Sequence, residues 1–215
     1  PPEKVRVIYS AVSDEFRPMH DEEKSAQLRQ RYHLPQKFVL YVGTIEPRKN
    51  LRRLMAAFAQ IEAQHPDLHL VLAGPGGWKM NGALEKEAAS LSGKVHYTGF
   101  VSQEDLPGIY SLATVFAFPS LHEGFGLPLL EAMACGVPVL TSNRSAMVEV
   151  GGSAVYLVDP LSVESIADGL NSLLTSQAQR EWYIGQGFQR VQQFSWEQTA
   201  RETAAVYEGI LAGQS

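Results

Sequence analysis

Short apolar runs alternate with helix-like stretches along the chain. The runs are VRVIY near residue 5, KFVLYVG at 37–43, LHLVLAG at 68–74, KVHYTGF at 94–100, TVFAFPS at 114–120 and VPVLTS at 137–142. Most are continuously apolar rather than alternating, which is typical of strands covered on both faces, as in a parallel sheet. Strand, crossover helix and parallel strand in repetition predict an α/β fold with a doubly wound parallel sheet.

The first long helix is expected at residues 51–64. Its apolar residues recur at intervals of three and four, and they are Leu51, Leu54, Met55, Phe58 and Ile61. This spacing places one apolar stripe toward the sheet, with Arg52 and Arg53 outside it. Asn50 is the expected N-cap of this helix.

The chain after Val158 has a wholly helical pattern, so we expect a helical C-terminal tail. Trp182 and Trp196 occupy amphipathic positions within the tail and are predicted to belong to the core. Ser195 is expected to cap the last helix, with Gln198 completing a capping box.

Composition excludes several classes of protein. The 215 residues, 45% of them apolar and 19% charged, fit one domain over 1–215 with a substantial core. The net charge of −5 argues against the broad basic surface that nucleic acid binding uses. No apolar stretch approaches the roughly 20 residues of a transmembrane helix, and no signal peptide is recognisable, so a cytoplasmic location is expected.

Cysteine and histidine usage gives no sign of a disulfide or a metal. The single cysteine, Cys135, lies in an apolar run and is expected to be a small core residue in a reducing compartment. The six histidines are scattered and no H-E-x-x-H motif occurs, so neither a metal nor a cofactor is predicted. His122 is expected to be a loop histidine that packs on the strand end, the alternative being a direct role in the site.

Two polar loops follow predicted strands. TIEPRKN follows the strand at 37–43, and LHEGFGLP follows the strand at 114–120. Ligands of open parallel sheets bind beyond the carboxyl ends of the strands, where both loops are expected. Arg48 and Lys49 come just before a helix N-terminus, whose amides also favour an anion such as a diphosphate. The alternative is that this pair is a solvated loop charge.

The loop HEGFGLP leads directly into a helix. Gly124 and Gly126 let the backbone approach a ligand closely, and Pro128 suits the first helical position. The amides from Phe125 through Leu127 would then face the crevice beyond the strands.

Two glutamates bracket this loop. Glu123 precedes the helix and Glu131 lies about one turn inside it, so both are expected to reach the crevice. Carboxylates accept hydrogen bonds from two hydroxyls, which suits the diols of a ribose or a hexose. The alternatives are a surface acid for Glu123 and a partner of the helix dipole for Glu131.

The chain resembles the C-terminal donor-binding domain of family 4 retaining glycosyltransferases over nearly its whole length. The resemblance rests on Glu123 and Glu131 within EGFGLPLLEAMACGVPVL, on LAGPGG and on VHYTGFVSQEDLPGIYSLATVFAFPS. It implies one half of a GT-B fold, in which two Rossmann-like domains face each other across a cleft. The N-terminal acceptor domain would be missing, in keeping with a start at Pro1, and this half alone would be inactive. Any peripheral membrane contact would be made by the missing half.

The resemblance also implies roles for individual residues. Glu123 would bind hydroxyls of the donor sugar, and Glu131 would bind the ribose of a nucleotide diphosphate sugar. The sugar and diphosphate would be bound by the amides of Gly124, Phe125, Gly126 and Leu127. Lys49 and Arg48 would neutralise the diphosphate.

One departure from the family concerns the strand end. Many members carry an arginine directly after the glycine of VG, whereas Thr44 follows Gly43 here. Lys49 aligns with the family lysine, but Arg48 is offset and either replaces the missing guanidinium or points to water.

The nucleobase is expected near Gly74 and near residues 99–101. Phe100 would pack beside the base or plug the core beneath the loop, and Val101 adjoins it. Trp78 lies close to this predicted pocket in sequence. TIEPRKN resembles the loop of a subgroup dominated by mannosyl transfer from GDP-mannose, which makes GDP-mannose the expected donor.

The implied reaction is transfer with retention by front-side attack. It needs no enzymic nucleophile and no metal, because electrostatic stabilisation of the leaving diphosphate is expected to dominate. A nicotinamide dehydrogenase is disfavoured, since no G-x-G-x-x-G opens the first helix. A nucleotide-sugar epimerase of the same fold and a nucleotide-binding module without catalysis remain as alternatives.

Overall fold

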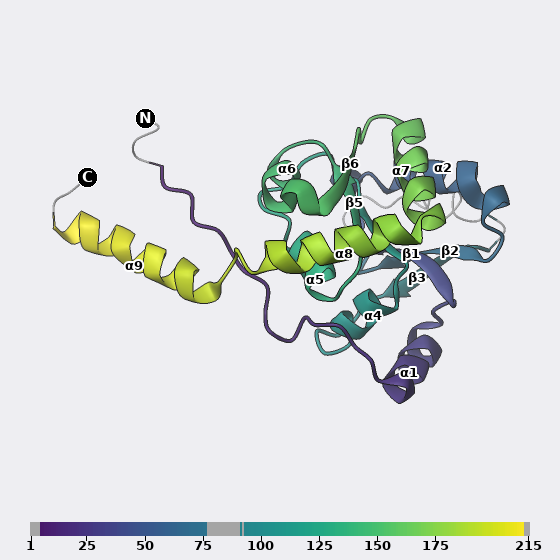
Figure 1. Ribbon diagram of the computed structural model, residues 1–215, viewed down its shortest axis with the longest axis horizontal. Coiled ribbons are helices and arrows are strands. Elements are labelled where there is room, and N and C mark those ends of the chain that lie inside the picture. The colour runs from purple at the N-terminus through teal and green to yellow at the C-terminus, as the bar shows by residue number, and fades with distance from the viewer. Residues whose placement is uncertain (1–4, 77–90, 92, 213–215) are drawn as a thin grey trace.

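The computed structural model describes residues 5–76, 91 and 93–212. Its centre is a six-stranded sheet in the order β3-β2-β1-β4-β5-β6, with every neighbouring pair parallel (Figure 1). The strands are β1 Lys37–Val42, β2 Leu68–Ala73, β3 Val95–Gly99, β4 Val115–Phe118, β5 Val139–Ser142 and β6 Val155–Val158. This confirms the predicted doubly wound parallel sheet.

Most of the helices lie around the sheet, whereas the last one, α9, extends away from it (Figure 1). The helices are α1 Glu22–Tyr32, α2 Leu51–Ile61, α4 Leu106–Leu112, α5 Leu127–Ala134, α6 Ala146–Gly151, α7 Val163–Thr175, α8 Gln177–Val191 and α9 Trp196–Leu211, with short 3-10 turns at Pro47–Lys49, Glu62–Gln64 and Gly152–Ala154. The strand order runs outward in both directions from β1 and β4. Because crossovers between parallel strands are right-handed, α2 and α5 cover opposite faces. α2 packs against α7, and α5 packs against α4 and α8.

The core lies between these layers. β1 and β2 are buried along almost their whole length, whereas the edge strand β3 is partly exposed. Phe116 stacks on Phe118, which in turn stacks on Tyr41. Cys135 is buried as predicted, and burial raises the pKa of its thiol to about 12.

Two strand predictions need correction. The run at 5–9 forms no strand, and Val5 and Val7 are 72% and 67% exposed. Its apolar content predicted burial in the sheet, but the segment runs beside α9, away from the sheet (Figure 1). The strand β6 was not predicted, because only four residues separate a glycine-rich turn from the polar sequence that follows.

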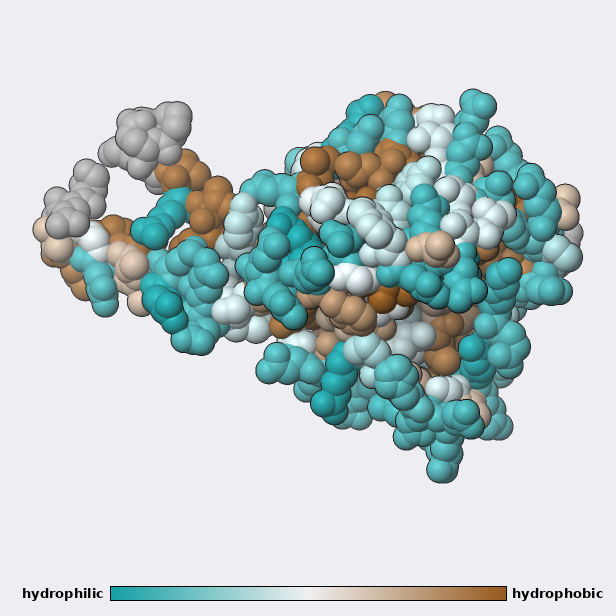
Figure 2. Space-filling view, viewed as in Figure 1, coloured by the Kyte–Doolittle hydropathy of each residue, from teal (hydrophilic) through white to brown (hydrophobic). Residues whose placement is uncertain are grey.

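The C-terminal helix is confirmed, but its expected packing is wrong. Ser195 Oγ accepts the amide of Gln198 at 3.0 Å, while the Gln198 side chain donates to Glu202 instead of completing the capping box. Trp182 on α8 and Trp196 on α9 are each 52% exposed rather than buried. An amphipathic pattern identifies an apolar face but not its partner. Figure 2 shows apolar residues gathered where the N-terminal segment runs alongside α9.

Candidate functional site

The loops after β1 and β4 lie side by side. β1 and β4 are neighbours at the point where the strand order reverses, which is where ligands of doubly wound sheets bind. The backbone amide of Leu121 in the second loop donates to the carbonyl of Arg48 in the first, at 2.9 Å. The two loops predicted to carry chemistry are therefore joined by main-chain contact.

Asn50 links these loops in a way that differs from its predicted role as an N-cap. Its backbone is left-handed, with φ of 62°, and its side chain makes no capping bond to α2. Instead, the buried side-chain amide donates to the carbonyl of Pro119 at 3.0 Å and to that of Pro160 at 2.7 Å. The left-handed backbone turns the side chain away from the helix and across to the loop after β4.

A compact charge cluster occupies the junction. Lys49 Nζ lies 2.8 Å from Glu123 Oε1 and 4.9 Å from the centre of the Phe118 ring. The same Glu123 oxygen accepts the Ser120 hydroxyl at 2.6 Å. The side chains of Lys49 and Glu123 are only 11% and 10% exposed, so the alternative of a solvated loop charge is wrong for Lys49. Ser120 was missed by sequence reasoning, because a serine at a strand end has no distinctive pattern.

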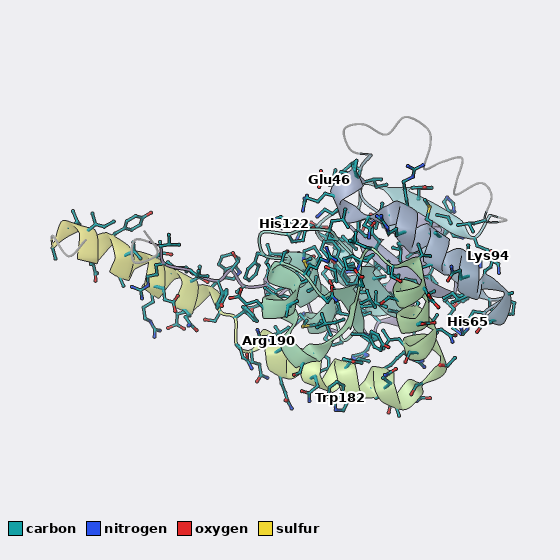
Figure 3. The ribbon with its side chains drawn as sticks, turned by 90° about the horizontal axis from the view of Figure 1, so that it is seen from above. Glu46, His65, Lys94, His122, Trp182 and Arg190 are labelled. Carbon is teal, nitrogen blue, oxygen red and sulfur yellow. The ribbon has the colours of Figure 1, made fainter. Side chains whose placement is uncertain are left out.

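Arg48 completes the cluster from its exposed side. Its guanidinium lies 2.7 Å from Glu123 Oε2 and 2.6 Å from Glu46 Oε1, and it donates to the carbonyl of His122 at 2.6 Å. Figure 3 shows Glu46 and His122 near each other in the upper part of the view. His122 lies in the loop, as expected, but it is exposed rather than packed on the strand end. Arg48 does not merely point to water, although its side chain remains 43% exposed.

Glu123 is held in its ionised form by this environment. Burial alone raises the pKa of a carboxyl group, but the hydrogen bonds from Lys49, Ser120 and Arg48 outweigh burial, and the pKa of Glu123 is lowered. The bond to Glu123 likewise raises the pKa of Arg48. The Glu123 backbone is fixed as well, because its amide donates to Ser145 Oγ and its carbonyl accepts from the same hydroxyl.

The glycine-containing loop turns sharply into α5. Gly126 adopts φ of 100°, which favours glycine, and caps the helix, so Leu127 takes the first helical position and Pro128 the second rather than the first. The first amides of a helix have no acceptor within it. Gly124 and Leu127 are exposed, whereas the Phe125 side chain packs against the core.

Glu131 lies apart from the charge cluster. Its Oε2 accepts the hydroxyl of the buried Tyr110, on α4, at 2.8 Å. Burial raises the pKa of Glu131, and the bond from Tyr110 opposes that rise. The two glutamates of the predicted motif therefore have opposite pKa shifts. Tyr110 was not predicted, because its contact depends on how α4 packs against α5.

The strand-end glycines are packed against each other. Gly43 and Gly74 have φ of 143° and 142°, and a Cβ on Gly74 would lie 2.2 Å from the Gly43 carbonyl oxygen. Thr44, which follows Gly43, is exposed, and its carbonyl accepts a hydrogen bond from the Tyr41 hydroxyl at 3.1 Å. These two glycines therefore allow the ends of β1 and β2 to approach closely, which is a structural role independent of any contact with a ligand.

The predicted base-binding residues follow β3. Phe100 is 76% exposed, so the alternative that it plugs the core is wrong, whereas Val101 is buried. Trp78 lies outside the described residues.

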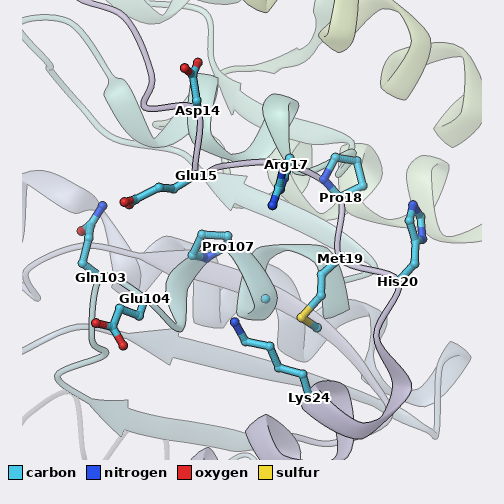
Figure 4. A pocket seen from close by; sticks show the side chains of 11 residues that line it. Asp14, Glu15, Arg17, Pro18, Met19, His20, Lys24, Gln103, Glu104 and Pro107 are labelled. Atoms are coloured by element: carbon cyan, nitrogen blue, oxygen red, sulfur yellow. The ribbon is translucent and has the colours of Figure 1, made fainter.

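A hollow of about 600 Å³ lies further along the same loop, between α4 and the segment that leads to α1. Gln103 and Glu104 line one side, and in the view of Figure 4 Arg17 lies above the hollow and Lys24 below it. No residue of the charge cluster around Lys49 and Glu123 lines this hollow. Its walls carry both acidic and basic side chains.

Two kinds of feature are absent from the part of the chain that the structure describes. No three or more of their His, Cys, Asp and Glu side chains gather as a metal-binding group. Within the same residues, no helix is both long and apolar enough to cross a membrane.

Comparison with known proteins identifies the family. A family model described as "Glycosyl transferases group 1" matches residues 24–190. The chain belongs to this family. It is 36% identical over 214 residues to the O-antigen chain mannosyltransferase B of Escherichia coli, covering 97% of this chain and 55% of that protein. It is 34% identical to the serotype-specific mannosyltransferase WbdA of the same organism, covering 92% of this chain and 25% of WbdA.

Solved structures agree with the fold. Sucrose-phosphate synthase from Thermosynechococcus elongatus superimposes with a TM-score of 0.80 at 30% identity, covering 97% of this chain and 53% of that one. The C-terminal domain of a group 1 glycosyl transferase (LpcC) from Francisella tularensis superimposes with a TM-score of 0.73 at 25% identity, covering 85% and 97%. The chain thus has the fold of one half of a GT-B glycosyltransferase, and it spans about half the length of the full-length proteins O-antigen chain mannosyltransferase B and sucrose-phosphate synthase.

Proposed function

We propose that this chain binds the nucleotide diphosphate sugar used by a retaining, metal-independent glycosyltransferase, with GDP-mannose as the donor. The observation that carries this proposal is the meeting of Lys49, Arg48 and Glu123 beside the N-terminus of α5, where the strand order reverses. This arrangement offers cations and free helix amides to a diphosphate, and a carboxylate to sugar hydroxyls.

Relatives support the choice of mannose and of transfer. O-antigen chain mannosyltransferase B and WbdA are both named as mannosyltransferases. Their names favour a transferase over an epimerase of the same fold. A solved structure of Anabaena HepE, similar in fold at a TM-score of 0.84 and 21% identity, contains UDP and glucose. A nucleotide and a sugar thus occur together in a protein of this fold.

The chain's own residues have distinct tasks in the proposed reaction. The bond between the sugar C1 and the diphosphate oxygen breaks, and negative charge builds on the leaving diphosphate. Lys49 and the amides of residues 124–127 stabilise that charge electrostatically. Arg48, which is more exposed, releases Glu46 and turns toward the phosphates. Glu123 orients the sugar through its hydroxyls.

The nucleoside occupies the outer part of the crevice. Glu131 accepts hydroxyls of the ribose with the carboxylate oxygen that Tyr110 leaves free. The base lies against Phe100, whose exposed ring offers a stacking surface. The acceptor is bound by a second domain of the full-length protein, and the chain alone binds donor without transferring the sugar.

Calorimetric titration tests the donor assignment. GDP and GDP-mannose are expected to bind in the micromolar range without added metal, with the same affinity in EDTA, whereas UDP and ADP bind far more weakly. Lys49→Ala and Glu131→Ala should each weaken GDP binding at least tenfold. If UDP binds as tightly as GDP, the choice of GDP-mannose is wrong. If no nucleotide binds, the site assignment itself fails.

A further inference from the structure

Three aromatic rings form a triangle behind the loop that precedes α5. The ring centres of Tyr9 and Phe125 are 6.1 Å apart, those of Tyr9 and Phe194 are 5.6 Å apart, and those of Phe125 and Phe194 are 6.0 Å apart. The three residues come from the N-terminal segment, the loop after β4 and the turn between α8 and α9. Each ring therefore touches the other two across large separations in sequence.

Phe125 is the anchor of its loop. Gly124 before it has open space around its Cα, and Gly126 after it has the left-handed backbone that begins α5. Between two glycines, the Phe125 ring is the one side chain that ties residues 124–126 to the rest of the molecule. The direction of the amides at 124–127 therefore depends on where that ring is held.

Tyr9 and Phe194 are themselves fixed. The Tyr9 carbonyl accepts the Thr199 hydroxyl of α9 at 2.6 Å, and the Tyr9 hydroxyl donates to Glu149 of α6. Phe194 is buried, and the Arg190 guanidinium lies 4.9 Å from its ring centre. The triangle joins α6, α8 and α9 to the loop.

Two segments lead away from the sheet at this triangle. The residues before Tyr9 are largely exposed, and α9 has no buried residue (Figure 1). Tyr9 and Phe194 lie where these two segments meet the rest of the chain, and the rings of both contact Phe125.

We infer that Phe125 is a positioning residue, and that its contacts with Tyr9 and Phe194 transmit the placement of residues 5–9 and of α9 to the donor-binding amides at 124–127. The inference rests on the proposed function of those amides. It adds a coupling that would tighten or loosen donor binding as the two segments move. It also gives the Phe125 side chain a role separate from that of its amide.

The test removes one corner of the triangle. Tyr9→Ala deletes a ring that is 40% exposed and lies outside the sheet, so the fold is expected to survive. Hydrogen exchange without nucleotide should quicken about threefold to tenfold at amides 124–127, the range expected for loss of aromatic pair contacts, and stay unchanged in β4. Affinity for GDP-mannose should fall by a similar factor. Phe125→Leu is the second variant and should act in the same direction.

Matched controls separate the ring from other features of the segment. Tyr9→Phe keeps the ring and loses only the bond to Glu149, so wild-type exchange and affinity are expected. Val7→Ala changes a 67% exposed residue in the same segment and should also behave as wild type. If Tyr9→Phe has the full effect of Tyr9→Ala, or if Tyr9→Ala has none, the coupling is refuted.

The two proposals fail in different ways. A wild-type chain that binds no nucleotide, but whose exchange at 124–127 responds to Tyr9→Ala, refutes the proposed function and leaves the coupling intact. A wild-type chain that binds GDP-mannose, with an unchanged Tyr9→Ala variant, refutes the coupling alone.

Discussion

Lys49 and Glu123 form a nearly buried ion pair, with 2.8 Å between Nζ and Oε1, that closes the gap between the loops after β1 and β4. The two partners differ in the charges around them. Glu123 also accepts a hydrogen bond from Ser120 and forms a second ion pair with Arg48. The Lys49 ammonium has the Glu123 carboxylate as its counter-charge. Removing either partner therefore has different consequences.

Glu123→Gln should destabilise the fold more than Lys49→Met. The first change leaves the buried Lys49 ammonium without a counter-charge and should cost about 3 kcal/mol, whereas the second leaves Glu123 paired with Arg48 and should cost about 1 kcal/mol. Urea denaturation at neutral pH measures both. Arg48→Met, at the 43% exposed position, is the control and should cost less than either. Equal losses of unfolding free energy for Glu123→Gln and Lys49→Met would contradict this difference between the two partners.

The two glutamates should give opposite pH dependences of stability. Because the folded pKa of Glu123 is lowered, its contribution is complete above its ordinary pKa of 4.5 and is lost as the pH falls through the lower folded value. Because the folded pKa of Glu131 is raised, its contribution is complete below its ordinary pKa of 4.5 and is lost as the pH rises through the raised value.

Unfolding free energies of single variants across the acid range measure these slopes. Glu123→Gln should flatten the loss of stability in acid, and Glu131→Gln should remove a loss that occurs as the pH rises. Identical profiles for both variants would contradict the opposite shifts. Cooperative, reversible unfolding of each variant is the necessary control.

Much of this fold could be predicted because a continuous run of apolar residues indicates a buried segment. The runs containing β1 to β5 were located correctly, and for β1, β2, β4 and β5 the reason is that strands covered on both faces are apolar throughout. The same rule failed at 5–9, where the apolar residues lie along α9, and at the four-residue β6. An apolar sequence indicates that a segment is covered, but it does not indicate which helix or strand covers it.

The candidate site was predictable only as a set of loops. The carboxyl-end rule placed Lys49 and Glu123 on the same edge of the sheet, but their contact also requires β1 beside β4, which is a property of strand order. Asn50 shows the remaining limit. An asparagine before a helix predicts a cap, but its left-handed backbone sends the amide to two proline carbonyls instead.

Glu131 and Tyr110 should have separable effects on nucleotide affinity. Glu131→Gln removes the charge that makes the carboxylate a strong acceptor and should weaken GDP binding about tenfold. Tyr110→Phe frees the second carboxylate oxygen and should leave affinity within about twofold while lowering stability by about 1 kcal/mol. Wild-type affinity should also fall as the pH drops through the raised pKa of Glu131, because the ionised form binds. Calorimetry at several pH values measures these effects, and a pH-independent affinity would exclude Glu131 from the site.

Gly74→Ala should be among the most damaging substitutions of a small residue in this chain. The new Cβ would lie 2.2 Å from the Gly43 carbonyl oxygen, and φ of 142° is strained for alanine, so β1 and β2 must separate at their carboxyl ends. A loss of about 3 kcal/mol in unfolding free energy is expected, together with weaker nucleotide binding, because the loop at 44–50 starts at this point. Gly76→Ala, two residues away, is the matched control, since its Cβ would meet nothing within 4 Å and its φ is ordinary. Thermal unfolding of the two variants decides the matter: equal stability would mean that β1 and β2 can part without cost.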